Sequence, residues 1–428
     1  MKILQVLHYS PLLGMGGSEV YTLSLAQALS REHDVRLFFT IPDDGGSRVE
    51  EGSCGGISYW ALKKDLLNYD SPFHEYSRWV EKEFIRVVKK FNPQVIHFQH
   101  LINLSLTLPS LAKKMGIPCC FTLHDFWLLC PRTFFLNSEM KNCATYSLSR
   151  CMRCMEDRIG YYALSGKGSR PIRYAKRCVK QALNFKKKIT AFVSLGLWRA
   201  YWVRKIFKAI AMFISPSPFL RTRFVRHGLA PQKIIVIPHG SDETIFNGIK
   251  KKSSPILRFA FIGTMRPQKG IYVLLEAFNV IAGLHELRLY GRLTPAVEDD
   301  LKKRIKNPHI YLMGELRQED KRKAFSEIDV LIVPSLCCES YSLVLSEAFM
   351  TKTPVIVSDI GAMAERVRDG EHGFTFPAGN AGKLAEKIQI FIDNRGLINS
   401  MAAHLPEVKP IELHAEEISK LYYGLAKG

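Results

Sequence analysis

The chain has 428 residues, which is too long for one domain of average size and fits two. Its hydrophobic content of 47% is typical of a protein with a folded core, and no run reaches the roughly 18 to 20 apolar residues that a membrane-spanning helix needs. The formal net charge of +20 is local: residues 158–241 contain 18 Lys and Arg and no acid, whereas the rest contains 42 basic and 40 acidic residues. These totals argue against a disordered chain and leave one basic segment to be explained.

The N-terminus and the cysteines both favour the cytoplasm. The first eleven residues, MKILQVLHYSP, have one lysine and an apolar run too short for a signal peptide, so they predict a first β-strand. Among the ten cysteines, two pairs are adjacent (Cys119–Cys120 and Cys337–Cys338), which suits buried residues better than a disulfide framework. We therefore expect a cytoplasmic protein whose cysteines are mostly thiols.

The first half alternates apolar, β-branched runs with helical patterns less regularly than the second half does. The alternation breaks between about 126 and 210, which indicates an insertion with a role of its own. The expected strands of this half are 2–8, 34–40, 57–62, 94–100, 118–125, 211–217 and 233–240.

The second half alternates strands and helices throughout, which predicts βαβ units and a parallel sheet covered by helices on both faces. Its strands are almost entirely apolar, as expected when both faces of a sheet are buried. They are 256–263, 287–291, 309–314, 329–335, 354–359 and 373–378.

The predicted fold class is thus α/β, with two parallel-sheet domains that face each other across a cleft. We expect an N-terminal domain over 1–250, which contains the insertion, and a C-terminal domain over 255–408. The stretch 247–255 has the composition of a linker. The last residues, 409–428, predict one amphipathic helix with no strand after it.

Ligands of such sheets bind outside the carboxyl ends of the strands, so the residues there are candidate ligands. Glu339 leaves the strand 329–335, and Glu347 lies in the second turn of the following helix. Carboxylates suit vicinal hydroxyls, and a helix N-terminus between them suits a phosphate; together these describe a sugar nucleotide. Taken alone, the two acids are better explained by a solvated helix N-terminus, where acids favour the helix dipole.

Other strand ends agree with that interpretation. Lys269 can reach a phosphate from the loop FIGTMRPQKG, with Arg266 as a second cation. Gly14, Gly16 and Gly17 allow a ligand to approach the backbone after the first strand, although a tight turn explains them as well. His124 ends the strand 118–125, where a lone histidine is more often a structural hydrogen-bonding group than a catalyst.

At these residues the chain resembles the retaining glycosyltransferases of the GT-B fold, family 4, also called the group-1 glycosyltransferases. The resemblance covers nearly the whole chain. It implies two Rossmann-like domains, with the C-terminal helix packing back on the N-terminal domain. It is carried by GMGGSEV, TLHDFWLLCPR, ISPSPFLRTRF, VIPHGSDETIF, FIGTMRPQKG and, above all, the long stretch from VPSLCCESYSLVLSEAF to GFTFPAGN.

The resemblance also implies roles for single residues. Glu347 would bind the ribose, Glu339 the donor sugar, Lys269 the departing phosphate, and His124 the sugar at the reacting centre. Further donor contacts would come from Gly16, Gly17, Thr264, Arg266, Gly291, Gly314, Tyr341, Ser342 and Leu343.

One position departs from the family pattern. Many members have an arginine directly after the first glycine of the loop that ends in KG, and here that position is Thr264. Either Arg266 takes its place or the leaving phosphate has one cation fewer.

The expected chemistry needs no cofactor. The leaving nucleoside diphosphate would be stabilised by basic side chains and a helix dipole in place of a metal. The family is thought to retain anomeric configuration by front-face attack, and no residue has to act as a covalent nucleophile.

The insertion contains four cysteines within 25 residues: Cys130, Cys143, Cys151 and Cys154. One C-x2-C pair with two more cysteines nearby can form a structural S4 zinc site. Four unlinked thiols, or one oxidisable pair, are the alternatives, because a single C-x2-C is a weak signature.

The basic segment 171–208 has 11 Lys and Arg, no acid, and the aromatic stretch LWRAYW. Basic residues interleaved with aromatic ones fit an interfacial helix on anionic lipid. Nucleic-acid binding and a solvated charged face are the alternatives; no nucleic-acid motif accompanies the segment, so no nucleic acid is expected.

We therefore expect a retaining, metal-independent hexosyltransferase on the inner face of the cytoplasmic membrane. It would transfer a sugar from a UDP-, GDP- or ADP-sugar to a lipid-linked saccharide or glycolipid in cell-envelope or exopolysaccharide synthesis. A transferase with a soluble acceptor is one rival, which failure to bind liposomes would favour. A non-catalytic membrane- or nucleic-acid-binding protein on the same scaffold is the other.

Overall fold

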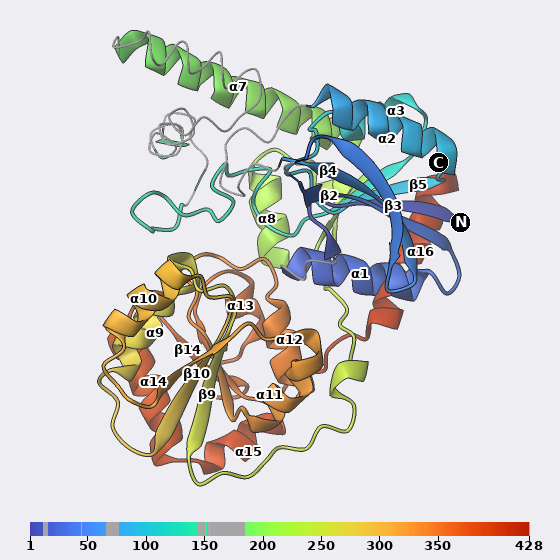
Figure 1. Ribbon diagram of the computed structural model, residues 1–428. Helices are drawn as coiled ribbons and strands as arrows, with labels where there is room; N and C mark the ends of the chain where they lie inside the picture. Colours follow the sequence, from blue (N-terminus) through green and yellow to red (C-terminus); the bar gives the residue numbers. More distant parts are fainter. Residues whose placement is uncertain are drawn as a thin grey trace. The chain divides into compact units, whose positions relative to one another are not determined.

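The computed structural model divides the chain into two compact units (Figure 1). The first consists of Met1–Glu139, Cys143–Gly240 and Ile411–Gly428, and the second of Met140–Asn142 and Ser241–Pro410. The residues described are 1–11, 16–43, 45–65, 77–143, 145, 150–151, 154 and 185–427, with the backbone alone described over 185–196.

The first unit is built on an eight-stranded sheet. Neighbouring strands pair in parallel throughout, apart from one edge hairpin. The two short strands next to the first strand on one side, VIHF and CCFT, are buried at every residue, which confirms that helices cover both faces. The strands in spatial order are β3 (Arg48–Cys54), β4 (Ile57–Lys64), β2 (Asp34–Pro42), β1 (Lys2–Val6), β5 (Val95–Phe98), β6 (Cys119–Thr122), β7 (Met212–Ser215) and β8 (Ile234–Val236).

Strand β3 was not expected from the sequence. It pairs antiparallel with β4, and the turn between them is Gly55–Gly56. Both glycines have positive φ, 56° and 84°, which is the requirement of the two-residue hairpin turn that matches strand twist. The two glycines are thus the sequence signal for the hairpin. Strand β3 itself is too polar to be recognised from its hydrophobicity.

Six α-helices of the first unit lie among the described residues. The C-terminal helix belongs to this unit and lies beside the first helix, where the Tyr21 hydroxyl contacts the His414 ring at 2.7 Å (Figure 1). The helices are α1 (Gly17–Leu29), α2 (Arg78–Phe91), α3 (Leu108–Lys114), α7 (Phe185–Ala209), α8 (Pro218–Arg226) and α16 (Ile411–Lys427).

The second unit is built on a six-stranded sheet that is parallel throughout, as the sequence predicts. Each expected strand is present. In spatial order the strands are β11 (Ile310–Gly314), β10 (His285–Tyr290), β9 (Leu257–Ile262), β12 (Val330–Val333), β13 (Val355–Ser358) and β14 (Gly373–Phe376).

Two apolar cores, one on each face of this sheet, hold the helices in place. One contains Phe259, Phe278 and Phe391, and the other contains Phe325 and Phe349. The α-helices are α9 (Ile271–Phe278), α10 (Pro295–Arg304), α11 (Lys321–Glu327), α12 (Leu343–Met350), α13 (Gly361–Arg366), α14 (Ala381–Asp393) and α15 (Gly396–Ala402), with 3-10 turns at η3 (Thr244–Phe246), η4 (Pro267–Lys269) and η5 (Gln318–Asp320).

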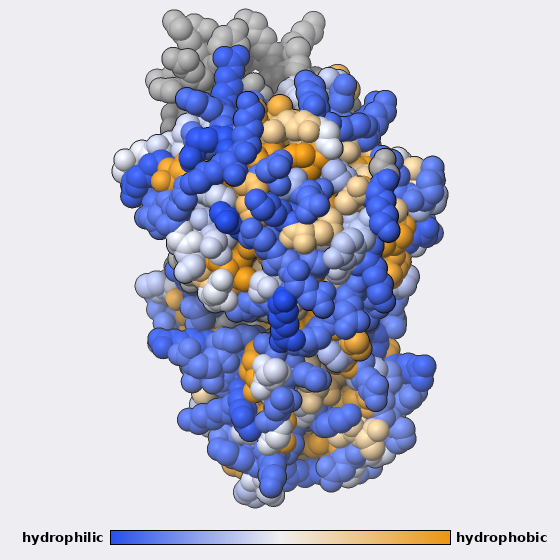
Figure 2. Space-filling model, turned by 90° about the vertical axis from the view of Figure 1, so that its right-hand side faces the viewer, coloured by the Kyte–Doolittle hydropathy of each residue, from blue (hydrophilic) through white to orange (hydrophobic). Residues whose placement is uncertain are grey.

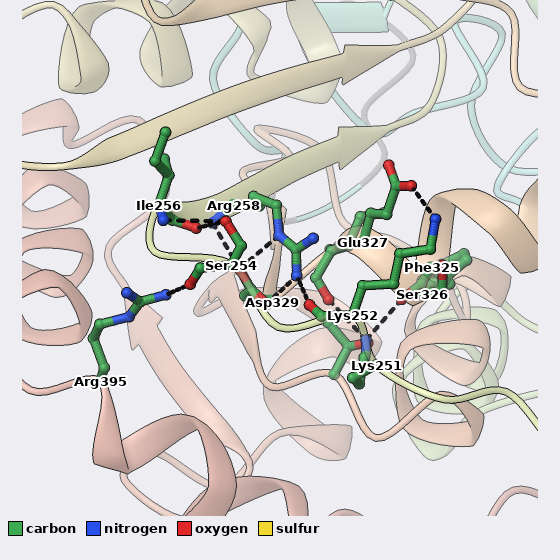
Figure 3. A network of polar contacts seen from close by, with 12 residues as sticks. Lys251, Lys252, Ser254, Ile256, Arg258, Phe325, Ser326, Glu327, Asp329 and Arg395 are labelled. Carbon is green, nitrogen blue, oxygen red and sulfur yellow. Dashed lines mark hydrogen bonds and ion pairs between the residues drawn. The ribbon is translucent and has the colours of Figure 1, made fainter.

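The stretch with linker composition is fastened to the second unit (Figure 3). Lys251 donates to the carbonyls of Phe325 and Ile328 at 2.8 and 2.7 Å, at the C-terminal end of α11. Arg258 forms a two-pronged ion pair with Asp329, with nitrogen–oxygen distances of 3.0 and 2.8 Å. These contacts attach Lys251 and Arg258 to the second unit, whose main segment begins at residue 241.

The surface is of the usual mixed kind. On the face drawn in Figure 2, hydrophilic residues predominate and hydrophobic ones occur in several separate areas. Among the helices of the described residues, none has the length and apolar character needed to cross a membrane.

Candidate active site

The second unit brings two of the predicted donor ligands together. Glu339 follows β12, and its Oε1 lies 2.6 Å from the Nζ of Lys269. The same oxygen accepts a hydrogen bond from the Ser335 hydroxyl at 2.7 Å. Both side chains of the ion pair are largely buried, so the pair is more than a surface contact.

The backbone fixes this pair in place. The carbonyl of Gln268 accepts from the amides of Leu336 and Cys337, which ties the η4 loop to the loop after β12. Gly270 has φ +75°, and a Cβ there would lie 1.8 Å from the carbonyl oxygen of Pro334. A glycine is therefore required at the point where the two loops meet.

The ion pair keeps Lys269 charged. Burial alone would lower the pKa of this lysine, but the adjacent Glu339 carboxylate raises it above its usual value overall. Arg266 opposes that effect, so it lies near Lys269, and its side chain is exposed. Thr264 is exposed as well. The site thus has one partly buried cation and one exposed cation.

Tyr341 and Ser342 form the turn that leads into α12. Arg366 donates to the carbonyls of Tyr341 and Ser342 at 2.8 and 2.9 Å, and its guanidinium lies 4.0 Å from the centre of the Tyr341 ring. Ser342 has φ +69° and its side chain does not cap the helix that begins at Leu343. A helix start that its own N-cap side chain does not cap is suited to an anion.

Glu347 lies in α12 and pairs with a residue that the sequence did not indicate. Its Oε1 is 2.5 Å from the Nζ of Lys321, the first residue of α11, and both side chains are largely buried. Lys321 lies in a run of charged residues, QEDKRKAF, in which nothing distinguishes it from its neighbours. Arg366 was missed for the same reason.

Gly291 and Gly314, two of the predicted donor contacts, lie at the ends of adjacent strands. Gly291 follows β10, and its amide donates to the carbonyl of Gly314, the last residue of β11, at 2.8 Å. A Cβ on Gly291 would lie 2.1 Å from the carbonyl oxygen of Gly263, which follows β9. The ends of β9, β10 and β11 thus lie close together, and each has a glycine with no side chain. Such a surface leaves room for a flat aromatic ring.

Gly16 and Gly17 lie in the first unit, at the start of α1, and Gly14 falls outside the described residues. Glu19, in the first turn of this helix, is buried and lies 3.3 Å from the Nε2 of His8. Burial raises the pKa of the Glu19 carboxyl. A Cβ on Gly16 would lie 2.6 Å from a Glu19 oxygen, so the glycine leaves room for that acid.

His124, also in the first unit, is hydrogen-bonded and uncharged. Its Nε2 lies 2.8 Å from the Oε1 of Gln99. Burial, with a smaller contribution from His100, lowers the pKa of His124 to about 3. The rings of Tyr21 and His239 lie beside it, at centroid distances of 5.2 and 5.3 Å.

The residue after His124 joins it in a small pocket. Asp125 accepts from the amide of Trp127 at 2.8 Å, and its other oxygen lies 3.3 Å from the Nε2 of His100. Apolar side chains complete the pocket; its lining is His100, Phe121, Leu123, His124, Asp125, Trp127 and Leu128. Its polar members all follow strands of the sheet, at their carboxyl ends.

The four insertion cysteines are near one another without forming a ready metal site. Burial is the main cause that raises the pKa of the Cys130 thiol, to about 12, and Cys151 makes a smaller contribution. Burial also raises the pKa of the Cys143 thiol, with smaller contributions from Cys154 and Cys151. Over the described part of the chain, no three His, Cys, Asp or Glu side chains are grouped so that they could hold a metal ion. The arrangement does not fit a preformed zinc site, and no step below depends on zinc.

Only the C-terminal part of the predicted membrane segment is described; residues 171–184 lie outside it. Helix α7 carries exposed Leu197 and Tyr201, with exposed basic side chains at Arg204 and Lys205. Arg199 faces inward instead, with its guanidinium 4.9 Å from the centre of the Trp127 ring and a hydrogen bond to the Trp127 carbonyl. One side of α7 therefore carries exposed basic and apolar side chains, while Arg199 contacts the loop after His124.

Family models match both units. Residues 15–244 match the model described as Glycosyltransferase Family 4, and residues 257–394 match the one described as Glycosyl transferases group 1. The chain belongs to glycosyltransferase family 4. The family predicted from the sequence is thereby confirmed.

Characterised relatives of this family 4 member are distant and cover part of it. A phosphatidyl-myo-inositol mannosyltransferase of Mycobacterium leprae is 32% identical over 133 residues, which is 30% of this chain and 35% of the relative. The capsular polysaccharide biosynthesis glycosyltransferase CapM of Staphylococcus aureus is 26% identical over 221 residues, 46% of this chain and 57% of CapM. The matches thus span between about a third and three-fifths of these relatives.

Solved structures confirm the GT-B fold of this family 4 chain. Sucrose-phosphate synthase from Thermosynechococcus elongatus matches with a TM-score of 0.66 and 18% identity, over 99% of each chain. Anabaena Alr3699/HepE in complex with UDP and glucose matches with a TM-score of 0.65 and 15% identity, over 99% of this chain and 100% of the other. At such identities the likeness concerns the fold alone.

Proposed function

We propose that this family 4 member is a retaining, metal-independent glycosyltransferase. It would move a sugar from a nucleotide-diphosphate sugar to a lipid-linked saccharide or glycolipid acceptor in cell-envelope or exopolysaccharide synthesis. The observation that carries the proposal is the partly buried Lys269–Glu339 pair at the carboxyl end of the second sheet.

The donor half of the proposal rests on the chemistry of the second unit. Lys269 and the start of α12 suit a diphosphate, while the carboxylates of Glu339 and Glu347 suit the hydroxyls of a sugar and a ribose. The glycine-lined strand ends at Gly291 and Gly314 suit the base. Solved structures of the same fold were obtained with UDP-glucose or with ADP, so we propose a UDP-, GDP- or ADP-sugar.

In the proposed reaction, charge develops on the leaving diphosphate. Lys269 and the amides of α12 are fixed donors that can stabilise this charge, which is the role a metal ion plays in other transferases. Glu339 would contact the donor sugar, and neutral His124 would contact the sugar at the reacting centre. Retention would follow from front-face attack, with the leaving phosphate taking the acceptor proton.

The acceptor half of the proposal rests on α7. Exposed Leu197 and Tyr201 with neighbouring cations suit an anionic lipid surface on the inner face of the cytoplasmic membrane. Two of the family relatives are named for phosphatidylinositol mannosylation and capsular polysaccharide synthesis. Both names are consistent with an acceptor at a membrane.

The test is a transfer assay that separates acceptor classes. The protein is incubated with radiolabelled UDP-, GDP- and ADP-sugars, and with either a lipid extract in vesicles or a panel of soluble saccharides. We expect label in the organic phase with one donor, and an α-linkage in the product if the donor is α-linked. Label in soluble products alone would favour the soluble-acceptor rival, and an inverted linkage would overturn retention.

A further inference from the structure

Arg366, the last residue of α13, holds the turn that leads from Glu339 into α12. Its Nη1 donates to the carbonyls of Tyr341 and Ser342 at 2.8 and 2.9 Å, and its Nη2 donates to the Ser346 hydroxyl at 2.9 Å. A guanidinium has only donors and a carbonyl oxygen only accepts, so the direction of the two backbone contacts is certain. One side chain therefore fixes both the turn and the first turn of α12.

The backbone of this turn needs such support. Ser342 has φ +69°, which is unfavourable for a residue with a side chain and persists only where the surrounding structure holds it. The other end of α13 is attached to the same segment, since the amide of Ala362 donates to the Glu339 carbonyl at 3.1 Å. A Cβ on Gly361 would lie 3.0 Å from the Glu339 backbone. Helix α13 thus contacts the segment from Glu339 to Ser342 at both of its ends.

The carbonyls that Arg366 binds belong to peptide groups whose amides are predicted donor contacts. The Tyr341 carbonyl shares a peptide group with the Ser342 amide, and the Ser342 carbonyl shares one with the Leu343 amide. Both peptide groups are trans, so each N–H points away from the guanidinium. Among the residues that the structure describes, neither amide has a hydrogen-bond acceptor. A hydrogen bond to a carbonyl polarises its peptide group, which makes the N–H a stronger donor.

The charge of Arg366 is not neutralised by an acid. Burial lowers the pKa of its guanidinium, and no carboxylate of the described residues opposes that effect. Its other neighbours are aromatic: the guanidinium lies 4.0 and 5.5 Å from the centres of the Tyr341 and Phe349 rings. A purely structural role would explain the three hydrogen bonds, but a neutral donor could make them equally well.

We propose that Arg366 is a positioning residue for the nucleoside diphosphate, which holds and polarises the amides of Ser342 and Leu343 so that they bind the charge on the leaving group. The inference rests on the proposed function, in which the start of α12 binds the diphosphate. Arg366 acts through two peptide groups and does not itself touch the ligand. Its charge compensates in part for the arginine that many family members have at the position of Thr264.

The first test compares ligands with and without phosphates. In Arg366→Met, Kd for the bound nucleoside diphosphate (UDP, GDP or ADP) should rise roughly 10- to 100-fold, the range for a residue that orients a ligand-binding group. Kd for the matching nucleoside, measured by competition, should stay unchanged. A merely structural role would weaken both ligands alike, so equal losses would overturn the proposal, as would an unchanged Kd for the diphosphate.

The matched control is an arginine two residues further along the chain. Arg368→Met removes an exposed side chain that pairs with Glu371, and it should leave both dissociation constants unchanged.

The second test separates charge from hydrogen bonding. Guanidinium chloride at millimolar concentration should restore part of the lost diphosphate affinity and of the lost kcat in Arg366→Ala. Urea has a similar planar shape and similar N–H donors but no charge, so it should restore less, and sodium chloride controls for ionic strength. If guanidinium restored no more than urea does, the proposal would be overturned.

A third measurement uses wild-type protein alone, so it holds even if the variants fail to fold. In protein labelled with nitrogen-15 leucine, the diphosphate should shift the amide signal of Leu343, which Leu343→Met identifies by its loss. Diphosphate binding that leaves this amide unmoved would overturn the proposal. Wild-type protein that binds no nucleoside diphosphate at all would instead contradict the proposed function.

Discussion

The Nζ of Lys269 lies 2.6 Å from the Oε1 of Glu339, so two predicted donor ligands form an ion pair with each other. Both side chains are largely shielded from water, so removing either one would leave the other charge poorly solvated and would destabilise the fold. The pair is therefore both a feature of stability and a preorganised part of the site, and its two roles can be separated by substitution.

Replacing Lys269 by Met should lower kcat strongly, while nucleotide affinity falls less. Lys269 is expected to act mainly on charge that develops as the diphosphate leaves, so kcat should fall about 100- to 1000-fold. Initial rates and nucleotide affinity, measured on the same preparation, check this. Lys383→Met, which removes one partner of the exposed Lys383–Glu386 pair, is the matched control. A loss of affinity as large as the loss of kcat would assign Lys269 to ground-state binding instead.

Replacing Glu347 by Gln should weaken binding of the nucleoside diphosphate itself. A hydrogen bond to a charged group contributes about 1.5 to 3 kcal/mol, which corresponds to roughly 10- to 150-fold in Kd. Calorimetric titration with UDP, GDP and ADP measures the effect. Glu371→Gln, at a half-exposed carboxylate of the same unit that pairs with Arg368, should leave Kd unchanged. If the two variants bound equally well, Glu347 would not be the ribose ligand.

Gly291→Ala should destabilise the second unit. The new Cβ would lie 2.1 Å from a backbone oxygen, so a strand end must shift, at a cost of about 1 to 3 kcal/mol and a fall in Tm of roughly 3 to 10 °C. Gly424→Ala is the control, since nothing lies within 4 Å of a Cβ at that position in α16. It should leave Tm unchanged or raise it. Calorimetry decides, and an unchanged Tm for Gly291→Ala would refute the close approach of the strands.

Acid should destabilise the first unit through its buried histidines. Burial lowers the pKa of His97 to about 3 in the folded protein, against an ordinary value near 6.5. Between these values the unfolded chain binds a proton that the folded chain does not, so stability falls as pH drops below about 6.5. The slope is at most about 1.4 kcal/mol per pH unit for each such histidine.

His97→Gln should reduce that slope. Urea unfolding at pH 7.5, 6 and 5 measures it, and His404→Gln, at an exposed histidine, is the control. A His97→Gln protein with the same acid slope as the wild type would show that His97 is protonated in the folded state.

The membrane part of the proposal predicts salt-sensitive binding to anionic vesicles. Changing Arg204, Lys205 and Lys208 of α7 to Gln should weaken binding to phosphatidylglycerol vesicles by about 1 kcal/mol for each residue, or roughly 100-fold together. The charge-matched control changes exposed Lys302, Lys303 and Lys306 in the second unit. Equal losses in both triple variants would make the attraction a matter of net charge, and absence of binding by the wild type would remove α7 from the account.

The sequence predicted the sheets well because parallel strands buried on both faces are runs of apolar, β-branched residues. It also predicted which residues follow those strands, among them Lys269, Glu339 and His124. It missed β3, which is polar because it lies at an edge of the sheet.

The residues that contact the predicted site residues could not be predicted from the sequence by their place after a strand. Lys321 pairs with Glu347 across 26 residues, and Gln99 with His124 across 25, through contacts that only the packed sheet determines. Arg366 is a further case: its partly buried guanidinium donates to the carbonyl of Ser342, yet in the sequence it is one charged residue of AMAERVRDG. A weak sequence signal was available for Gln99 alone, since a glutamine directly after an apolar strand marks a polar strand end.

The most direct test of the central claim is release of nucleoside diphosphate from a panel of UDP-, GDP- and ADP-sugars, by the wild type and by Glu339→Gln and Glu347→Gln. The account predicts turnover of one donor class by the wild type and its loss in both variants, with the folded state of each variant confirmed by its circular dichroism spectrum. Turnover that survives in both variants would place the donor elsewhere. No release by the wild type from any donor, together with no shift of its Tm by any nucleotide, would contradict the assignment of this chain as a nucleotide-sugar-dependent transferase.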